Sequence, residues 1–253
     1  MKAITIKGKE IGGEKPQICI PITSTKPSEL MEELREVISS NPDLIEWRVD
    51  YFDDVEDADK VIEVLEDIYP LLTNFPLIFT CRMKEEGGYK QIIQSKRINL
   101  IKKVIKSQLI DFLDIELING KEKIGEILNE IGSSQIKLIL SSHDFENTPS
   151  KDAIIERLVK AQEYGADIAK IAVMPNNQKD VLTLLGASLE ARQEHVGIPL
   201  ITMSMAGRGL VTRIAGNLFG SAISFAAGRQ ASAPGQIPIW ELRKSMEILH
   251  RAL

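Results

Sequence analysis

The sequence has 253 residues, of which 43% are hydrophobic and 26% charged, and its formal net charge at pH 7 is −5. This composition is typical of a globular protein, and it argues against binding to nucleic acid or to an anionic membrane. The two cysteines, Cys19 and Cys81, lie in separate apolar runs without CxxC spacing, so we expect buried thiols in a reducing compartment. The charged N-terminus is unlike a signal peptide and no apolar run reaches membrane-spanning length, so we expect a soluble, cytoplasmic protein.

Short apolar runs rich in β-branched residues alternate along the chain with longer amphipathic segments. The short runs predict eight strands, at residues 17–22, 44–50, 76–82, 111–117, 136–143, 167–173, 199–205 and 221–228. The amphipathic segments predict eight helices, at residues 27–40, 57–72, 94–108, 122–132, 150–165, 178–195, 211–220 and 239–253. Strict alternation of this kind requires parallel strands with the helices packed outside them.

Eight strand–helix units in a chain of this length predict an α/β protein with a closed (β/α)8 TIM barrel, which we expect to span residues 1–253 as one catalytic domain. An open, doubly wound sheet is the alternative fold. The absence of a GxGxxG motif after the first predicted strand disfavours the dinucleotide-binding form of that sheet. We expect the first dozen residues, with Gly12 and Gly13, to form a β-hairpin that closes the bottom of the barrel.

Charged side chains occupy the C-terminal ends of most predicted strands, where the active sites of parallel barrels lie. Because side chains alternate along a strand, Glu46, Arg48 and Asp50 share one face of the second strand. Asp114 and Glu116 share one face of the fourth strand in the same way. Charges on strands that are buried on both sides are rare, so their recurrence indicates a functional site. The third, fifth and sixth strands contribute Arg82, His143 and Lys170.

Lys170 and His143 are the sharpest candidates for catalysis. Lys170 lies within an apolar run, where burial penalises the ammonium form, so we expect a lowered pKa and an amine able to form an iminium with a ketone. His143 ends the neighbouring strand and can transfer protons near neutral pH. Taken singly, a snorkelling or ion-paired lysine and a structural histidine are the alternatives. Because the two side chains lie on adjacent strands, a catalytic role for the pair is favoured over two separate structural roles.

Other candidates are less specific. Arg48, Arg82 and Arg213 could bind a carboxylate or hydroxyl groups through their planar guanidinium groups, or could instead pair with nearby acids. The Gly-rich segment 203–216 could hold an anion at a helix N-terminus, and segment 228–238 could be a mobile lid or an ordinary connection. No group of His, Cys and carboxylate residues has the spacing of metal ligands, so we expect no metal site.

Seven short motifs distributed over the chain together resemble the type I 3-dehydroquinate dehydratases. They are EWRVD (46–50), FTCR (79–82), EGG (86–88), SSHDF (141–145), AKIAVMP (169–175), TMSM (202–205) and ASAPGQ (231–236). The resemblance implies a hydro-lyase of the shikimate pathway, in aromatic amino-acid biosynthesis, that converts 3-dehydroquinate to 3-dehydroshikimate. It also implies a Schiff-base intermediate, no metal or organic cofactor, and a homodimer.

The same resemblance implies roles for individual residues. Lys170 would be the Schiff-base lysine, His143 the general acid and base, and Glu86 the carboxylate that supports His143. Arg213 would bind the substrate carboxylate. The substrate hydroxyl groups would be bound by Glu46, Arg48, Arg82, Ser232 and Gln236. The substrate ring would pack against Met203 and Met205. One departure is Pro21 at the end of the first strand, where some family members have serine, which puts a polar contact from that position in doubt.

Two other functions remain open at this point. A Schiff-base aldolase on the same barrel would usually need a phosphate-binding site at the ends of strands seven and eight. That region here contains ASAPGQ, with small residues and little positive charge. A non-catalytic barrel that binds a polyol acid or a protein partner would gain nothing from a lysine buried beside a histidine. The sequence therefore favours dehydration of 3-dehydroquinate.

Overall fold

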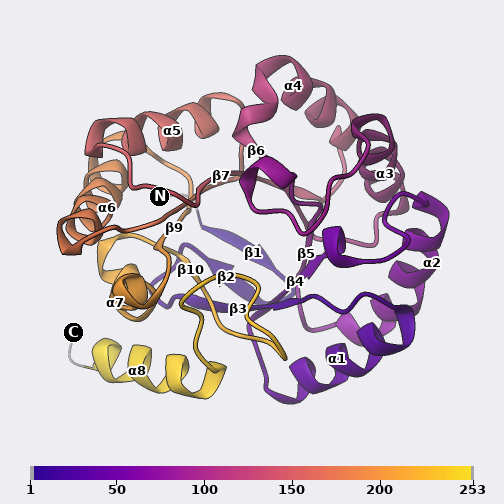
Figure 1. Cartoon of the computed structure of the whole chain (residues 1–253), viewed down its shortest axis with the longest axis horizontal. Helices are drawn as coiled ribbons and strands as arrows, with labels where there is room; N and C mark the ends of the chain where they lie inside the picture. The colour runs from indigo at the N-terminus through magenta and orange to yellow at the C-terminus, as the bar shows by residue number, and fades with distance from the viewer. Residues whose placement is uncertain (1–2, 252–253) are drawn as a thin grey trace.

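The computed structural model describes residues 3–251, and its central feature is an eight-stranded parallel sheet that curls into a barrel inside a ring of helices (Figure 1). The strands are β3 (Gln17–Ile22), β4 (Leu44–Arg48), β5 (Leu77–Thr80), β6 (Phe112–Glu116), β7 (Lys137–Asp144), β8 (Ile168–Val173), β9 (Leu200–Ser204) and β10 (Ile223–Phe225). Their spatial order is β10-β3-β4-β5-β6-β7-β8-β9. A parallel bridge between Leu200 and Ser221 joins the β9 and β10 sides. The predicted TIM barrel is therefore confirmed and the open sheet is wrong.

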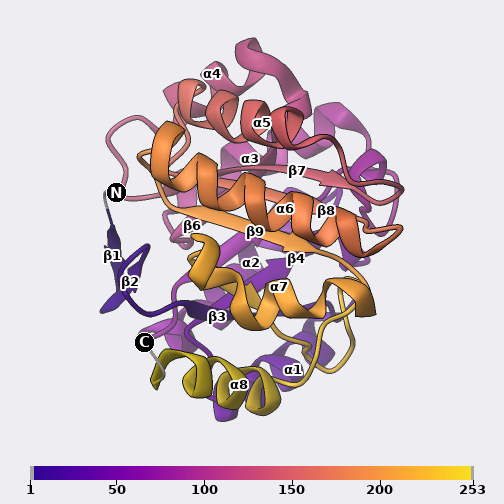
Figure 2. The same ribbon diagram turned by 90° about the vertical axis from the view of Figure 1, so that its left-hand side faces the viewer.

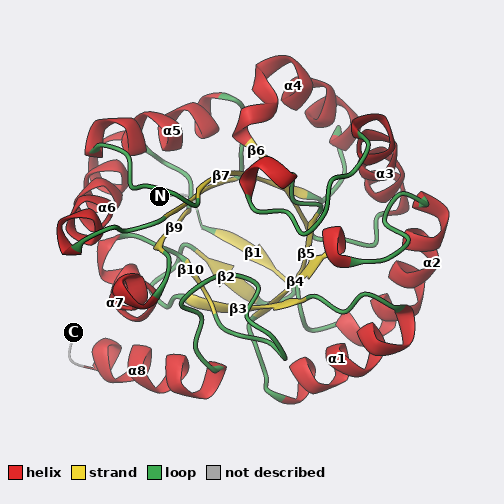
Figure 3. Ribbon diagram, in the orientation of Figure 1, coloured by secondary structure: helices red, strands yellow, loops and turns green. Residues whose placement is uncertain are grey.

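One helix follows each strand of the barrel and covers its outer side (red in Figure 3). The helices are α1 (Pro27–Ser39), α2 (Ala58–Ile68), α3 (Gln94–Ser107), α4 (Gly120–Ile131), α5 (Lys151–Glu163), α6 (Gln178–Glu190), α7 (Leu210–Ala215) and α8 (Ile239–Arg251). Local capping sets where several of them begin. The Ser150 side chain accepts a hydrogen bond from the α5 backbone, and Asn177 forms a capping box with Asp180 at the start of α6. Among residues 3–251, no helix is long and apolar enough to span a membrane.

Several predicted elements end earlier than the sequence pattern indicates. The second strand stops at Arg48, because Asp50 folds back to bind the Arg48 guanidinium and residues 49–51 form a 3₁₀ turn. The last strand stops at Phe225, and the Ala227 amide donates instead to Ile237 at the base of the following loop. The predicted helices 57–72, 178–195 and 211–220 each finish in a 3₁₀ or π turn rather than in continuous α-helix.

An N-terminal hairpin closes the bottom of the barrel, as the sequence predicts. It consists of antiparallel strands β1 (Ile4–Ile6) and β2 (Lys9–Ile11). The turn is formed by Lys7 and Gly8, both with positive φ, as two-residue hairpin loops favour, whereas Gly12 and Gly13 follow the hairpin. Ile11 is fully buried in the apolar cluster of the barrel interior. Figure 2 shows the hairpin at the end opposite the strand tips.

The inward side chains of the strands form two layers that differ in character. The bottom layer is apolar and fully buried: Leu44, Ile78, Phe112, Ile139, Ile168 and Ile201. Two residues further along each strand, the upper layer consists of Glu46, Thr80, Asp114, Ser141, Lys170 and Met203, all buried as well. Side chains two residues apart share a face, so the upper layer lies directly over the bottom layer. The polar end of the interior is thus the C-terminal end of the strands.

Candidate active site

A narrow cavity opens at the C-terminal ends of the strands, above the upper layer. Every residue to which the family resemblance gives a role lines it except Arg213, whereas the strand-end acids Asp50, Asp114 and Glu116 lie outside the lining. The cavity is also lined by residues that were not predicted, which are Gly87, Phe145, Ala172, Phe225 and Ala233. Pro21 is buried and is not among the lining residues. The tertiary structure therefore brings together residues that are far apart in the sequence, from Glu46 on β4 to Gln236 in the segment after β10.

Lys170 projects from β8 into this cavity and is 6% exposed. Its Nζ donates to Asp114 Oδ2 at 2.8 Å and lies 3.6 Å from Glu46 Oε1. The amine also lies over the Phe225 ring, 4.7 Å from the ring centroid. The apolar sequence neighbours of Lys170 pack outwards against the helices. The inward surroundings of the amine are therefore ionic, with two carboxylates, rather than apolar as the sequence run suggests.

His143, near the end of β7, is held by Glu86 through two hydrogen bonds. The imidazole Nδ1 lies 2.9 Å from Glu86 Oε2, and the backbone N–H of His143 donates to the same oxygen at 2.8 Å. Burial raises the pKa of Glu86 to about 8 and lowers the pKa of His143 well below its usual range. Because charge is disfavoured on both groups, the pair holds its protons as a coupled unit. Nε2 remains available to a ligand.

The EGG motif places Glu86 by means of two glycines. Glu86 ends a 3₁₀ turn, and Gly87 follows it with φ of 84°, a conformation that favours glycine. A Cβ on Gly87 would lie 2.3 Å from the Phe145 ring, and a Cβ on Gly88 would lie 2.3 Å from the carbonyl oxygen of Arg82. The loop can therefore pass close to both β5 and β7, which brings the Glu86 carboxylate to His143.

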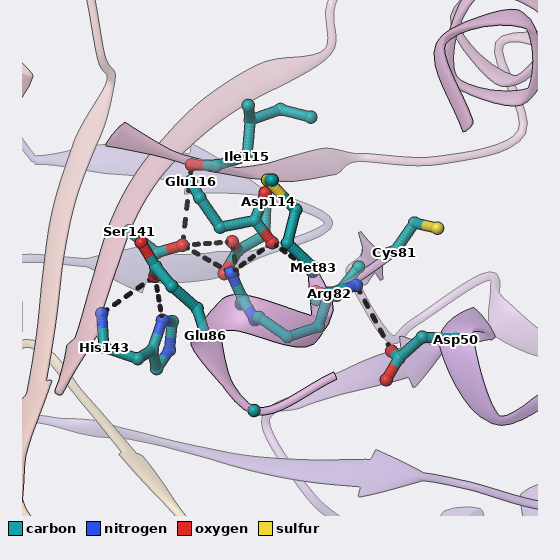
Figure 4. A network of polar contacts seen from close by, with 12 residues as sticks. Asp50, Cys81, Arg82, Met83, Glu86, Asp114, Ile115, Glu116, Ser141 and His143 are labelled. Carbon is teal, nitrogen blue, oxygen red and sulfur yellow. Dashed lines mark hydrogen bonds and ion pairs between the residues drawn. The ribbon is translucent and has the colours of Figure 1, made fainter. Parts of the chain in front are cut away.

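A network of buried charges lies beneath the cavity, with Arg82 at its centre (Figure 4). Arg82 Nη1 donates to Glu116 at 3.0 Å and to Ser141 at 2.7 Å, and Nη2 donates to Asp114 at 2.9 Å. Arg97 on α3 donates to the other oxygen of Glu116 at 2.5 Å. Arg97 was not predicted from the sequence. It shares the buried face of its helix with Leu100 and Val104, and because a buried arginine needs a partner, this position could have indicated an ion pair.

Asp50 fixes a second arginine at the rim of the cavity. Arg48 donates from Nε and Nη2 to the two Asp50 oxygens, at 2.9 and 2.8 Å. The same carboxylate accepts the backbone N–H groups of Arg82 and Tyr89. Asp50 is fully buried, and it therefore ties the end of β4 to the loop that carries Glu86. The sequence allowed an ion pair between Arg48 and a nearby acid such as Asp50, but it gave no sign of the Asp50 contacts with the backbone of Arg82 and Tyr89.

Arg213, on α7, is 2% exposed and lies beside the cavity rather than in its lining. Its Nη1 donates to the Phe225 carbonyl at 3.3 Å and its Nη2 to the Pro234 carbonyl at 3.0 Å, while Nε has no partner within residues 3–251. No carboxylate of the described residues pairs with it, and burial lowers its pKa to about 10. Its remaining contact is with the Met203 sulfur, 3.6 Å from Nη1. A buried guanidinium whose acceptors are all uncharged is suited to receive an anion.

The segment 228–236 covers the mouth of the cavity in this structure. Ser232 and Gln236 line the cavity, and the Ser232 backbone N–H donates to Gln236 Oε1 at 2.8 Å. The Pro234 carbonyl accepts from the Ala206 N–H as well as from Arg213. At the outer end of the segment, Arg229 forms a two-point ion pair with Glu36 of α1. The segment is thus closed over the site and tied at both ends.

The remaining ionisable candidates have no visible part in the site. Cys19 and Cys81 are buried and unpaired, and burial raises the pKa of the Cys81 thiol to about 12. Within the part of the chain that the structure describes, no group of three or more His, Cys, Asp or Glu side chains is arranged to hold a metal ion. The chemistry available at this cavity is that of an amine, an imidazole–carboxyl pair and guanidinium groups.

The sequence of this chain is similar over nearly its full length to several proteins named 3-dehydroquinate dehydratase. It is 43% identical to the 3-dehydroquinate dehydratase of Bacillus licheniformis over 252 residues, covering 100% of this chain and 99% of that protein. It is 41% identical to the 3-dehydroquinate dehydratase of Clostridioides difficile strain 630, again covering 100% of this chain and 99% of the relative.

Solved structures agree with the sequence matches. The crystal structure of 3-dehydroquinate dehydratase from Geobacillus kaustophilus has a TM-score of 0.96 and 41% identity, with 99% of this chain and 97% of that chain covered. A type I enzyme from Clostridium difficile with covalently modified comenic acid has a TM-score of 0.95 and 41% identity, with 100% and 99% covered. The model of the type I 3-dehydroquinase family matches residues 18–252. The chain therefore belongs to the type I 3-dehydroquinase family.

Proposed function

We propose that the chain dehydrates 3-dehydroquinate to 3-dehydroshikimate, with Lys170 as the Schiff-base amine and His143 as the proton carrier. As a type I 3-dehydroquinate dehydratase it is a hydro-lyase of the shikimate pathway, and this membership favours dehydration over aldol cleavage or ligand binding alone. The observation that carries the assignment of roles is that the Lys170 amine and the His143 imidazole, on adjacent strands β8 and β7, line the same closed cavity.

The first step forms the covalent intermediate. The neutral Lys170 amine attacks the C3 ketone, and the carbinolamine loses its oxygen as water. From the ammonium form, the overall exchange is one ammonium and one ketone for one iminium and one water, so neither protons nor charge are left over. The iminium makes the C2 proton far more acidic than it is in the ketone, which divides one difficult elimination into two easier steps.

The second step is the elimination itself. His143 Nε2 removes the C2 proton and leaves an enamine, while the Nδ1 contact with Glu86 orients the ring. The enamine electrons then expel the C1 hydroxyl, which takes a proton from His143 and leaves as water. Water finally hydrolyses the conjugated iminium, releasing 3-dehydroshikimate and the Lys170 amine. His143 thus carries both proton transfers of the elimination.

Substrate binding is assigned from the charges around the cavity. We assign the substrate carboxylate to Arg213, because its guanidinium is buried without a carboxylate partner among residues 3–251. We assign hydrogen bonds with the substrate hydroxyls to Glu46, Arg48, Arg82, Ser232 and Gln236. Met203 and Met205 would pack against the substrate ring. All seven residues line the cavity. Arg82 also donates to three protein groups, which hold its guanidinium in place beside the cavity.

Two further parts of the proposal concern the molecule as a whole. The segment 228–236 acts as a lid that opens to admit substrate and, when closed, shields the iminium from bulk water. The chain acts in the cytoplasm as a homodimer, in keeping with the resemblance to its family. Light scattering after size-exclusion chromatography tests the dimer, since a monomer would have a mass near 28.2 kDa.

Borohydride trapping tests the assignment of Lys170. Incubation with 3-dehydroquinate should produce the absorbance of a conjugated enone, and borohydride added during turnover should attach the ligand irreversibly to Lys170. Lys170→Ala should abolish both signals, whereas Lys137→Ala, which removes a partly exposed lysine paired with Asp167, should preserve both. Peptide mapping that found the ligand on any other lysine would contradict the assignment.

A further inference from the structure

The Asp114 carboxylate lies beneath the cavity in direct contact with the Lys170 amine, and the reaction described above gives it no role. Asp114 is fully buried and does not line the cavity. Its Oδ2 accepts from Lys170 Nζ at 2.8 Å, while its Oδ1 accepts from Arg82 at 2.9 Å and from Ser141 at 2.6 Å. Because each oxygen has its own donors, the carboxylate is held in one orientation, with Oδ2 directed at the amine.

Asp114 is also the acceptor best placed to follow the amine through the reaction. The other carboxylate near Lys170, Glu46, lies farther from Nζ at 3.6 Å, and the same Glu46 oxygen accepts from Thr80 at 2.8 Å. The charged and titratable groups that surround the amine from the neighbouring elements are Cys19, Glu46, Asp114 and His143, and Arg82 contacts the other Asp114 oxygen. Of these, only Asp114 is within hydrogen-bond distance of Nζ.

The chemistry of iminium formation makes this contact consequential. The ammonium carries three N–H groups and one positive charge, and the iminium keeps the positive charge with one N–H group. An acceptor already within 2.8 Å of Nζ can hold that last N–H without moving. A fixed N–H direction also fixes the plane of the C=N bond, and therefore the direction of the C2–H bonds relative to His143 on the adjacent strand.

We propose that Asp114 is the counter-ion of the Lys170 iminium, which it keeps protonated and oriented during the elimination. The proposal rests on the Schiff-base role assigned to Lys170. A protonated iminium withdraws electrons from C2, whereas a neutral imine does so weakly, so a counter-ion that favours the charged form speeds the elimination. The same charge favours the ammonium of the free enzyme and so opposes the attack on the ketone at low pH.

Asp114 is suited to this role because it stays ionised. Burial would raise the pKa of Asp114, but the adjacent charges of Arg82 and Lys170 outweigh burial and hold it well below its usual range. Arg82 is in turn held by Glu116, which Arg97 also contacts. The carboxylate therefore presents a full negative charge to the amine over the whole pH range in which an enzyme of this kind is assayed.

The test compares Asp114→Asn with the wild type in two assays over a pH series. The first is the initial rate of iminium formation, measured as the fraction of enzyme labelled when borohydride quenches the mixture at short times after 3-dehydroquinate is added, and the second is steady-state turnover. Without the counter-ion, neutral amine exists at lower pH, so the acid limb of labelling should move down by about 1–3 pH units. The kcat should fall by about 10²–10³-fold, as for loss of one preorganised electrostatic contact, with a much smaller change in KM.

Two matched variants separate this role from a structural one. Glu116→Gln removes a buried carboxylate from the same arginine without touching Lys170, so it should leave the acid limb of labelling in place. Asp114→Glu keeps the charge and displaces it by one methylene, so it should label at wild-type pH with reduced kcat, and it also serves if Asp114→Asn does not fold. Circular dichroism and thermal melts establish that each variant is folded.

Each outcome supports the proposal or overturns it. An acid limb that moves in Asp114→Asn but not in Glu116→Gln supports the counter-ion. The proposal is overturned if the acid limb of labelling lies at the same pH in Asp114→Asn and wild type, or if Glu116→Gln shifts it by as much as Asp114→Asn does. If Asp114→Asn cannot be folded, a downward shift of the acid limb in Asp114→Glu also overturns the proposal. Failure of the underlying function looks different, because wild-type enzyme would then show no turnover or would not be labelled at Lys170.

Discussion

The bottom and upper layers of the barrel interior come from the same strands and are both buried, but one is apolar core and the other is polar and lies at the cavity. On β6 the change from apolar to charged occurs between Phe112 and Asp114, and on β8 it occurs between Ile168 and Lys170. The bottom layer packs against the hairpin by burial of apolar surface alone. The upper layer contains charges that cost several kcal/mol each to bury and that persist because they are paired. Burial by itself therefore does not distinguish scaffold from site.

The pairing in the upper layer has a further consequence. A charge that loses its partner in a buried site leaves the other charge uncompensated, so substitutions there disturb electrostatics as well as packing. A bottom-layer substitution removes contacts and leaves a cavity. We accordingly expect the two layers to respond to substitution in different measurements: the upper layer in rate and pH dependence, the bottom layer in the free energy of unfolding.

The largest effect is expected from removing the proton carrier. His143→Ala should lower kcat by about 10⁴-fold or more, because general acid–base catalysis is worth about 10²–10⁴-fold in a step and two steps here use the same imidazole. The variant should still be labelled by borohydride at Lys170, since iminium formation needs only the amine. Near-normal turnover would move the proton transfer to another group, with Glu86 the next candidate. His195→Ala, in the π turn that follows α6, is the control.

Phe112→Ala should break the bottom layer without altering the chemistry. Removal of a fully buried phenylalanine side chain costs about 3–5 kcal/mol in the free energy of unfolding. Urea denaturation, followed by the fluorescence of the buried Trp47, measures that loss. The folded fraction should keep the wild-type KM and pH profile. A pH profile altered as strongly as the stability would mean that the two layers are not separable.

The pH dependence should depend on the Glu86–His143 pair. For Nε2 to accept a proton the pair must first lose one, and burial raises the pKa of Glu86 to about 8, so kcat/KM should rise as pH increases through that value. Glu86→Gln removes the titrating carboxyl and leaves only His143, whose pKa is lowered by burial, so the acid limb should move to lower pH. An identical limb in both enzymes would assign it to a different group.

Gln236→Ala should test the lid with a smaller effect. Loss of one hydrogen bond, worth about 0.5–1.5 kcal/mol, should raise KM by about 2–12-fold and leave labelling of Lys170 intact. Gln230→Ala, an exposed glutamine of the same segment, is the matched control. Trypsin should cut after Arg229 in free enzyme and more slowly with substrate or trapped adduct bound. Equal cleavage rates, together with a wild-type Gln236→Ala, would show that the segment is an ordinary connection.

The smallest effect is expected from chelators. Treatment with EDTA should leave kcat and KM unchanged, because the amine and the imidazole together account for the whole reaction. Activity lost in EDTA and restored by a divalent ion would mean that a metal ion contributes to the reaction. Ion pairs and hydrogen bonds between side chains would then not account for the polar upper layer by themselves.

Much of the site could be predicted because strand periodicity is local. Alternation of side chains placed Glu46 with Arg48, and Asp114 with Glu116, on shared faces of their strands, and the rule that barrel sites lie at the C-terminal strand ends located the site. Glu86 is different, because it lies in a loop without periodicity and was predicted only through the EGG motif of the family resemblance. Local patterns say which way a side chain points, but not which group it meets there.

By itself, the sequence determined the barrel, the family and the face on which each reactive side chain lies, since these follow from repeating patterns and motifs along the chain. Only the tertiary structure decided the partners. Asp114 meets Lys170 across 56 residues and Glu86 meets His143 across 57. It also revealed Arg97 supporting Glu116, and an ionic environment for Lys170 where its apolar sequence neighbours predict an apolar one. The physical reason is that hydrogen bonds and ion pairs depend on distances of a few ångströms between strands and loops that are remote in sequence, and closure of the barrel sets those distances.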